Sequence, residues 1–245
     1  MGTLLATFLL TAPPTKAFTL TLDPRLCANP SDCMNNDYRG STAELDFNFS
    51  DTLEGVKLEM AIANRTARDL GSALVGVGFD LPDFVKSFKY DRGTSTYGQV
   101  YRNAALPPFS WTFDLGVRSR NMQPSGNPED NTFAGGNPIA GLLPGQTTKI
   151  SWFVNAGDLN ARALEDYMYR AYLNQNLRAA GRFEQVGSQG QGKDRVLGVI
   201  KFVQPPQEVP EPGGWLGLTA ISAAIALYGG RGGRKKAKLV RCSQR

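Results

Sequence analysis

Apolar and polar residues alternate along two neighbouring segments of this chain, and this alternation restricts its fold more than any other feature. In residues 43–49, leucine and phenylalanine take one parity, while acidic and amide residues take the other. The same pattern recurs in residues 56–62, and residues 51–55 between them are rich in turn formers. A period of two places every second side chain on one face of a strand. The two segments therefore predict a hairpin with one buried and one solvated face.

Further short apolar runs, separated by turn residues, predict strands along much of the chain. They cover residues 18–22, 73–82, 85–90, 98–101, 109–117, 149–154, 182–186 and 195–202. The 27 glycines and 15 prolines favour turn-rich β structure over a helical bundle. Short strands at such spacing are typical of β-sandwiches. We expect residues 18–203 to form one mainly β domain, a sandwich of the jelly-roll or Ig-like kind.

One amphipathic helix is predicted to interrupt the strands. Asp158 is suited to accept hydrogen bonds from the free amides at its start. An apolar stripe then recurs at every fourth residue, at Leu159, Ala163, Tyr167 and Ala171. We expect the helix to run to about Leu177, with Gly181 ending the helical stretch.

Two closely spaced cysteines bear on the compartment in which the chain folds. Cys27 and Cys33 flank an Asn-Pro-Ser turn and can close a small loop, so we expect a disulfide in an exported chain. Two free thiols are the alternative. A zinc site is not expected, because the chain has no histidine and its only other cysteine is Cys242. We expect no bound metal and no cofactor.

The lack of histidine also restricts catalysis. It removes Ser-His and Cys-His nucleophile systems and histidine acid–base chemistry. A pair of carboxylates, as used in glycoside hydrolysis, remains open. Asp80, Asp83 and Asp114 are candidates because each lies near the end of a predicted strand.

Aromatic residues are the better indication of a binding role. Candidates for a platform that stacks on sugar rings are Trp111, Trp152, Tyr97 and Tyr101. Core packing is the alternative for all four.

Two polar features have simpler interpretations. The segment 122–145 is expected to be a solvated surface loop, although the oxygens of residues 129–131 could ligate calcium. Arg182, Glu184 and Asp194 are expected to be charges on edge strands.

The positive charge of the chain is concentrated at its C-terminal end. The net charge is +5, and residues 231–245 carry seven Lys or Arg and no acidic residue. Removing those seven charges leaves −2 for the rest of the chain, so the main domain is close to neutral. A nucleic-acid partner is therefore not expected.

Both ends of the chain resemble export signals. Residues 1–17 have an apolar run, two prolines and a small-x-small triplet, as in a secretory signal cleaved after Ala17. No Lys or Arg precedes Leu4, so either the true start of the chain lies upstream of Met1 or these residues are a buried first strand. At the other end, residues 204–212 are rich in proline, and residues 213–230 carry no charge over a length that can span a bilayer. The basic residues then place 231–245 in the cytoplasm and the domain outside.

This arrangement resembles the PEP-CTERM sorting signal of bacterial exosortase substrates. The motif residues are Pro210, Glu211 and Pro212, followed by the apolar span and by the basic cluster of Arg231, Arg234, Lys235, Lys236 and Lys238. The resemblance covers about 30 residues and implies export, recognition by an exosortase and cleavage near the Pro-Glu-Pro motif. The catalytic residues for that step belong to the exosortase.

The resemblance gives an expectation for function. Such proteins are commonly linked to exopolysaccharide and biofilm formation, so we expect a non-enzymatic surface or matrix protein. It would be anchored transiently in the inner membrane and then released to the cell surface or the medium. Its domain would serve structure, adhesion or glycan contact. The alternative is a secreted carbohydrate-active enzyme that uses paired carboxylates.

Overall fold

The computed structural model describes residues 18–36, 39–91, 95, 97–107, 109–119 and 138–200. All of them belong to the first of two compact units, Met1–Lys201, and the second unit is Phe202–Arg245. The predicted signal segment, residues 129–131 and the Pro-Glu-Pro motif lie outside the described residues, as do the apolar span 213–230 and the basic tail. Among the helices of the described part, none has the length and apolar content needed to cross a membrane.

Strands make up most of the described part, which confirms the prediction of a mainly β domain with one α-helix. The strands are β1 (Phe18–Leu22), β2 (Met34–Asn36), β3 (Ala43–Thr52), β4 (Gly55–Asn64), β5 (Ala73–Phe79), β6 (Ser87–Asp91), β7 (Tyr97–Ala105), β8 (Thr112–Ser119), β9 (Thr147–Asn155), β10 (Ala179–Val186) and β11 (Gly192–Ile200). The helix is α1 (Ala161–Leu173), and short 3-10 turns include η1 (Pro24–Leu26) and η2 (Pro30–Asp32).

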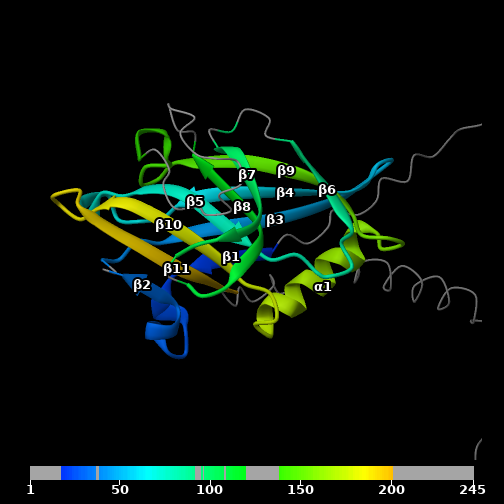
Figure 1. Cartoon of the computed structure of the whole chain (residues 1–245), viewed down its shortest axis with the longest axis horizontal. Helices are drawn as coiled ribbons and strands as arrows, with labels where there is room; N and C mark the ends of the chain where they lie inside the picture. Colours follow the sequence, from blue (N-terminus) through cyan, green and yellow to red (C-terminus); the bar gives the residue numbers. More distant parts are fainter. Residues whose placement is uncertain are drawn as a thin grey trace, which may run out of the picture. The chain divides into compact units, whose positions relative to one another are not determined.

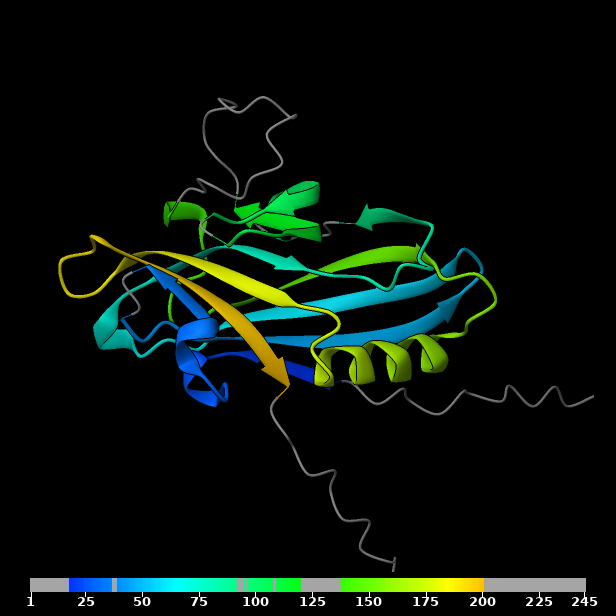
Figure 2. The same cartoon turned by 60° about the horizontal axis from the view of Figure 1, so that its bottom comes forward.

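The strands form one continuous antiparallel sheet. Their order is β6-β9-β4-β3-β1-β11-β10-β5-β8-β7, and β2 pairs with β11 beside β1 (Figure 1). The sheet is curled, so strands that are not neighbours share one core. Phe79 of β5 makes an edge contact with Trp152 of β9 at 5.0 Å between ring centroids, and a second with Phe47 of β3 at 5.9 Å. Figure 2 shows the curl together with α1 lying along it.

The hairpin β3–β4 follows directly from the alternating sequence. Phe47 pairs with Met60, and both side chains are fully buried. Along β3 the burial alternates as the sequence predicts, from Ala43 to Phe49. The turn is shorter than predicted, because the pairing extends to Thr52 opposite Gly55. Gly55 has a φ of 120°, and a Cβ there would lie 2.8 Å from the carbonyl oxygen of Val154, so a glycine fits this turn best.

The two edges of the curled sheet lie together. The Tyr90 hydroxyl of β6 donates to the carbonyl oxygen of Tyr97 at the start of β7. Further along, the Arg102 guanidinium of β7 lies 4.2 Å from the ring centroid of Phe88 in β6. These side-chain contacts bring the first and last strands of the sheet order together without a backbone ladder between them.

The helix differs from its prediction in phase and in length. Asn160, not Asp158, caps its start, and the Asn160 side chain accepts a hydrogen bond from the Ala163 amide at 2.9 Å. The buried residues are Ala161, Leu164, Glu165, Met168, Ala171 and Tyr172. Tyr167 is 48% exposed. Four residues advance a helix by about 400°, so a stripe spaced strictly by four drifts away from one face. Gly181 lies in β10 and does not end the helix.

Three charges predicted for edge strands are instead buried. β10 lies between β11 and β5, so it is an interior strand. Arg182 and Glu184 on β10 form a buried ion pair, and Asp194 on β11 has no exposed surface. Arg182 and Glu184 alternate with the buried Phe183, as on a solvated face, but this face of the sheet is covered. Asp194 lies opposite Phe183 in the β10–β11 ladder and has the parity of the buried Val196.

Candidate functional site

The four aromatic candidates for glycan contact do not form an exposed platform. Tyr97 and Trp152 have no exposed surface, and Tyr101 is 9% exposed. Trp152 packs against Phe79, and the Tyr97 hydroxyl donates to the carbonyl oxygen of Leu74. A buried ring cannot stack on a sugar, so these three positions follow the alternative of core packing. Trp111, which is partly exposed, lines a pocket.

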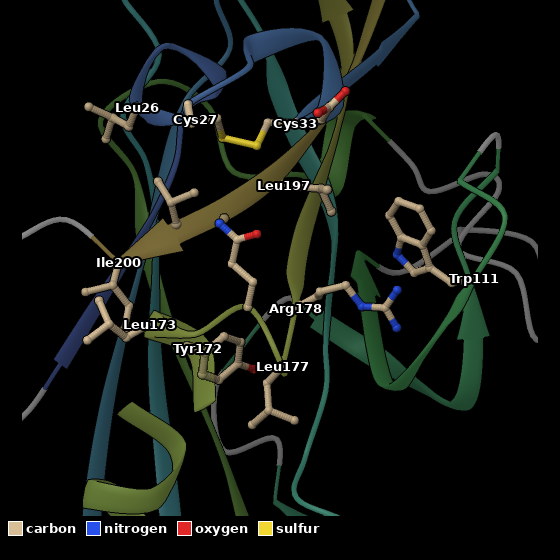
Figure 3. A pocket seen from close by; sticks show the side chains of 15 residues that line it. Leu26, Cys27, Cys33, Trp111, Tyr172, Leu173, Leu177, Arg178, Leu197 and Ile200 are labelled. Atoms are coloured by element: carbon tan, nitrogen blue, oxygen red, sulfur yellow. A yellow bond between two sulfur atoms is a disulfide. The ribbon is translucent and has the colours of Figure 1, made fainter. Parts of the chain in front are cut away.

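This pocket, here called the Arg178 pocket, has a volume of about 490 Å³. Its apolar walls come from the disulfide loop, the end of α1 and the end of β11 (Figure 3). Representative residues are Leu26, Leu173, Leu197 and Ile200. Arg178 and Trp111 also line it, and Arg178 lies in the segment between α1 and β10. The volume is within the range of about 300–1,000 Å³ that is usual for small-molecule sites.

The disulfide predicted between Cys27 and Cys33 is confirmed, and it forms one wall of the pocket. The bond joins the ends of η1 and η2, and the amide of Leu197 in β11 donates to the Cys33 carbonyl oxygen at 2.7 Å. The loop begins at Asp23. Burial acts to raise the pKa of Asp23, but hydrogen bonds from the Arg25 side chain and amide outweigh it and lower the pKa. The loop is therefore fixed both to β11 and at its own start.

Arg178 is oriented by two contacts. The Asp80 carboxylate accepts hydrogen bonds from the Arg178 amide at 2.9 Å and from its Nε at 3.2 Å. The guanidinium carbon lies 4.9 Å from the ring centroid of Trp111, and Phe109 stacks on Trp111 at 5.1 Å. The cation is therefore fixed between an acidic and an aromatic side chain, with 40% of its own side chain exposed.

Asp80 is an unusual carboxylate in this site. Burial raises its pKa, the Arg178 side chain opposes that rise, and nearby Asp114 adds to it. The Tyr172 hydroxyl donates to the Asp80 carbonyl oxygen at 2.8 Å, and burial raises the pKa of Tyr172 well above its usual value. Asp80 is therefore bound both to Arg178 in the pocket wall and, through Tyr172, to the end of α1.

The raised pKa of Asp80 predicts a pH dependence of stability. The folded state keeps the Asp80 proton at pH values where the unfolded chain, with a pKa near 3.8, has released it. The Asp80 contribution to the free energy of unfolding should therefore fall as pH rises from 3.8 through the raised pKa. Urea unfolding of the wild type and of Asp80→Asn between about pH 4 and 7 measures this. The free energy of unfolding should fall more steeply with rising pH in the wild type than in Asp80→Asn. Parallel pH profiles of the two proteins would contradict the assignment of this pH dependence to Asp80.

The three candidate carboxylates lie in one region but face different surroundings. Asp83 and Asp114 line a second pocket of about 300 Å³, together with Lys86 and Arg102. The Asp114 carboxylate also accepts a hydrogen bond from the Leu81 amide at 2.7 Å. Asp80 instead binds Arg178. Within the described ranges, no group of three or more Cys, Asp or Glu side chains is arranged to hold a metal ion.

Comparison with protein families, with curated proteins and with solved structures finds no significant match to this chain. The candidate site therefore rests on its own geometry. Sequence reasoning indicated Trp111 and the disulfide, but it missed Arg178. This arginine lies outside every alternating or helical pattern, and no local signal pairs it with Asp80, which lies 98 residues away in the chain.

Proposed function

We propose that this chain is an exported bacterial surface or matrix protein, sorted through a PEP-CTERM signal and processed by an exosortase. The observation that carries the proposal is the Cys27–Cys33 disulfide in the main domain, because such bonds persist in oxidising compartments outside the cytoplasm. The sequence at the C-terminal end supports it independently. There a Pro-Glu-Pro motif, an uncharged span and a basic cluster follow one another in that order.

In this proposal the described domain is a non-enzymatic module exposed outside the cell. We interpret its curled sheet as a sandwich-like architecture of the jelly-roll or Ig-like kind, and residues 213–230 as a transient membrane anchor. The domain serves structure, adhesion or contact with exopolysaccharide. Of the four aromatic candidates, Trp111 is the one that is not buried, so it is the one that supports a contact role.

The sorting proposal predicts that one glutamate controls processing. In a host with its exosortase, the wild-type chain should appear as a shortened form at the cell surface or in the medium. Glu211→Ala, in the motif, should leave a full-length chain in the inner membrane. Glu208→Ala, three residues earlier in the same proline-rich segment, is the matched control and should be processed like the wild type. Immunoblots of cell fractions with an antibody against the domain measure both length and location.

The same immunoblots also test the opposite outcome. If Glu211→Ala and a chain lacking residues 209–245 were shortened and retained at the surface like the wild type, the C-terminal segment would not be a sorting signal.

One observation favours a second candidate, the secreted carbohydrate-active enzyme. Asp83 and Asp114 line the same pocket of about 300 Å³, as two carboxylates acting on one glycosidic bond would have to. Turnover of a polysaccharide by the purified protein, lost in both Asp83→Asn and Asp114→Asn, would replace the non-enzymatic interpretation.

A further inference from the structure

We infer that the Arg178 pocket binds a small amphipathic carboxylate. The carboxylate is bound by the guanidinium of Arg178, and the apolar body lies against the leucine and isoleucine side chains of the pocket. This inference goes beyond the sorting proposal and does not depend on it, since it rests on the contacts within the domain.

Two side chains hold Arg178 in place. The Asp80 carboxylate accepts hydrogen bonds from the Arg178 amide and from its Nε, and the ring of Trp111 contacts the guanidinium. Within the described part of the chain, neither Nη atom of Arg178 has a hydrogen-bond acceptor or an ion-pair partner. Asp80 and Trp111 thus hold the cation, while its two Nη donors have no acceptor among the described residues. Two parallel N–H donors of this kind match the two oxygens of a carboxylate.

An unpaired donor lies beside the guanidinium. The Nε1 atom of Trp111 is buried and has no hydrogen-bond acceptor among the described residues. Figure 3 shows this nitrogen on the side of the indole ring that is nearer to Arg178. Buried donors are rarely left unpaired in folded proteins. An anionic oxygen beside Arg178 would give the indole N–H its missing acceptor after a small shift of either ring or ligand.

The remaining walls of the pocket are mostly apolar. Leu26 and Leu173 are large apolar side chains that line the pocket and yet are 46% and 39% exposed. Leu197 and Ile200 continue the apolar surface between the disulfide loop and the end of α1. Sugar hydroxyl groups placed against these side chains would lose hydrogen bonds to water without replacement. An aliphatic chain would instead cover them, with the favourable effect of apolar burial.

The charges around the pocket restrict the ligand to one negative group. Asp32 belongs to the wall, and Asp80 lies directly behind Arg178. A ligand with several charges, such as an oligouronate, would bring further negative groups toward these carboxylates. We therefore expect a monocarboxylate with an apolar chain of medium length.

The test uses octanoate as the probe and isothermal titration calorimetry on the full-length protein. Octanamide has the same chain without the charge, and glucuronate has the charge on a polar body. We expect octanoate to bind and both analogues to bind at least about tenfold more weakly, because each lacks one half of the recognition. Equal affinity for octanamide, tighter binding of glucuronate, or no heat of binding with millimolar octanoate would each overturn the inference.

Two pairs of variants locate the binding. Arg178→Gln should weaken octanoate binding at least about tenfold, whereas Arg170→Gln, on the exposed face of α1, should not change it. Because Arg178 also pairs with Asp80, a second pair avoids the ion pair. Leu26→Asp adds a negative charge at the pocket, and Leu53→Asp adds the same charge at the fully exposed tip of the β3–β4 hairpin. In this second pair, Leu26→Asp should abolish octanoate binding and Leu53→Asp should leave it unchanged. Binding that survives both Arg178→Gln and Leu26→Asp would place the ligand elsewhere.

Discussion

Replacing Phe47 by alanine is expected to lower the free energy of unfolding by about 3–5 kcal/mol, the cost typical of deleting a buried phenylalanine side chain. Phe47 has no exposed surface. Its ring lies 4.9 Å from that of Phe18 in β1, and 5.9 Å from those of Phe79 in β5 and Tyr172 in α1. One side chain therefore joins both halves of the curled sheet to the helix. The cavity left by alanine cannot be closed by any single element.

Urea unfolding followed by circular dichroism measures this loss. The matched control is Leu53→Ala at the tip of the β3–β4 hairpin, where the side chain is fully exposed. Its effect should stay within about 0.5 kcal/mol. Similar losses in the two variants would show that the contacts around Phe47 do not hold the two halves of the sheet together.

Asp194→Asn is expected to lower the free energy of unfolding by about 2–3 kcal/mol, since hydrogen bonds to a buried charged group are each worth about 1.5–3 kcal/mol. The Asp194 carboxylate is fully buried and accepts from the Arg39 amide at 3.0 Å and from the Ser41 amide at 3.2 Å. Between these two residues Gly40 has a φ of 104°. The amide group of asparagine would turn a donor toward one of the two backbone N–H groups.

The comparison for this variant is Asp166→Asn, an exposed position on α1. It makes the same chemical change without a buried hydrogen bond, so the free energy of unfolding should change by less than about 0.5 kcal/mol. If Asp194→Asn were equally harmless, the segment 39–41 would not depend on the carboxylate for its conformation.

The strands could be predicted because their burial is one-sided. In β3 and β4 each apolar residue of the alternating pattern faces the core, from Leu45 to Ile62. The disulfide could be predicted as well, because the short spacing of Cys27 and Cys33 leaves little choice of partner. Both features depend on residues that are close in the sequence.

The strand order could not be predicted in this way. Alternation indicates which side of a strand is buried, but not which strand lies beside it. β1 pairs with β3 on one side and with the last described strand, β11, on the other. No local pattern brings Leu20 opposite Ile200. The single curled sheet follows from such distant pairings.

The buried charges and the pocket were missed for a related reason. Arg182 and Glu184 have the parity of a solvated face, and only the folded chain covers that face. Asp194 is a charge on the same side of its strand as the buried Val196, opposite the buried Phe183. Part of the cover is the connection from β7 to β8, whose Phe109 packs in one apolar cluster with Ala180 of β10. Arg178 is brought to Asp80 and Trp111 by the same folding. Sites built from irregular segments leave no periodic trace in a sequence.

The central position of β1 has a consequence for the order of events in folding. The first described strand pairs with the last described one, so this part of the sheet forms only after the chain as far as Ile200 is present. Pairings of such long sequence separation make folding slow relative to domains with local contacts. A chain exported as we propose would therefore stay incompletely folded while it crosses the membrane. It would become compact only when its final strand arrives on the outer side.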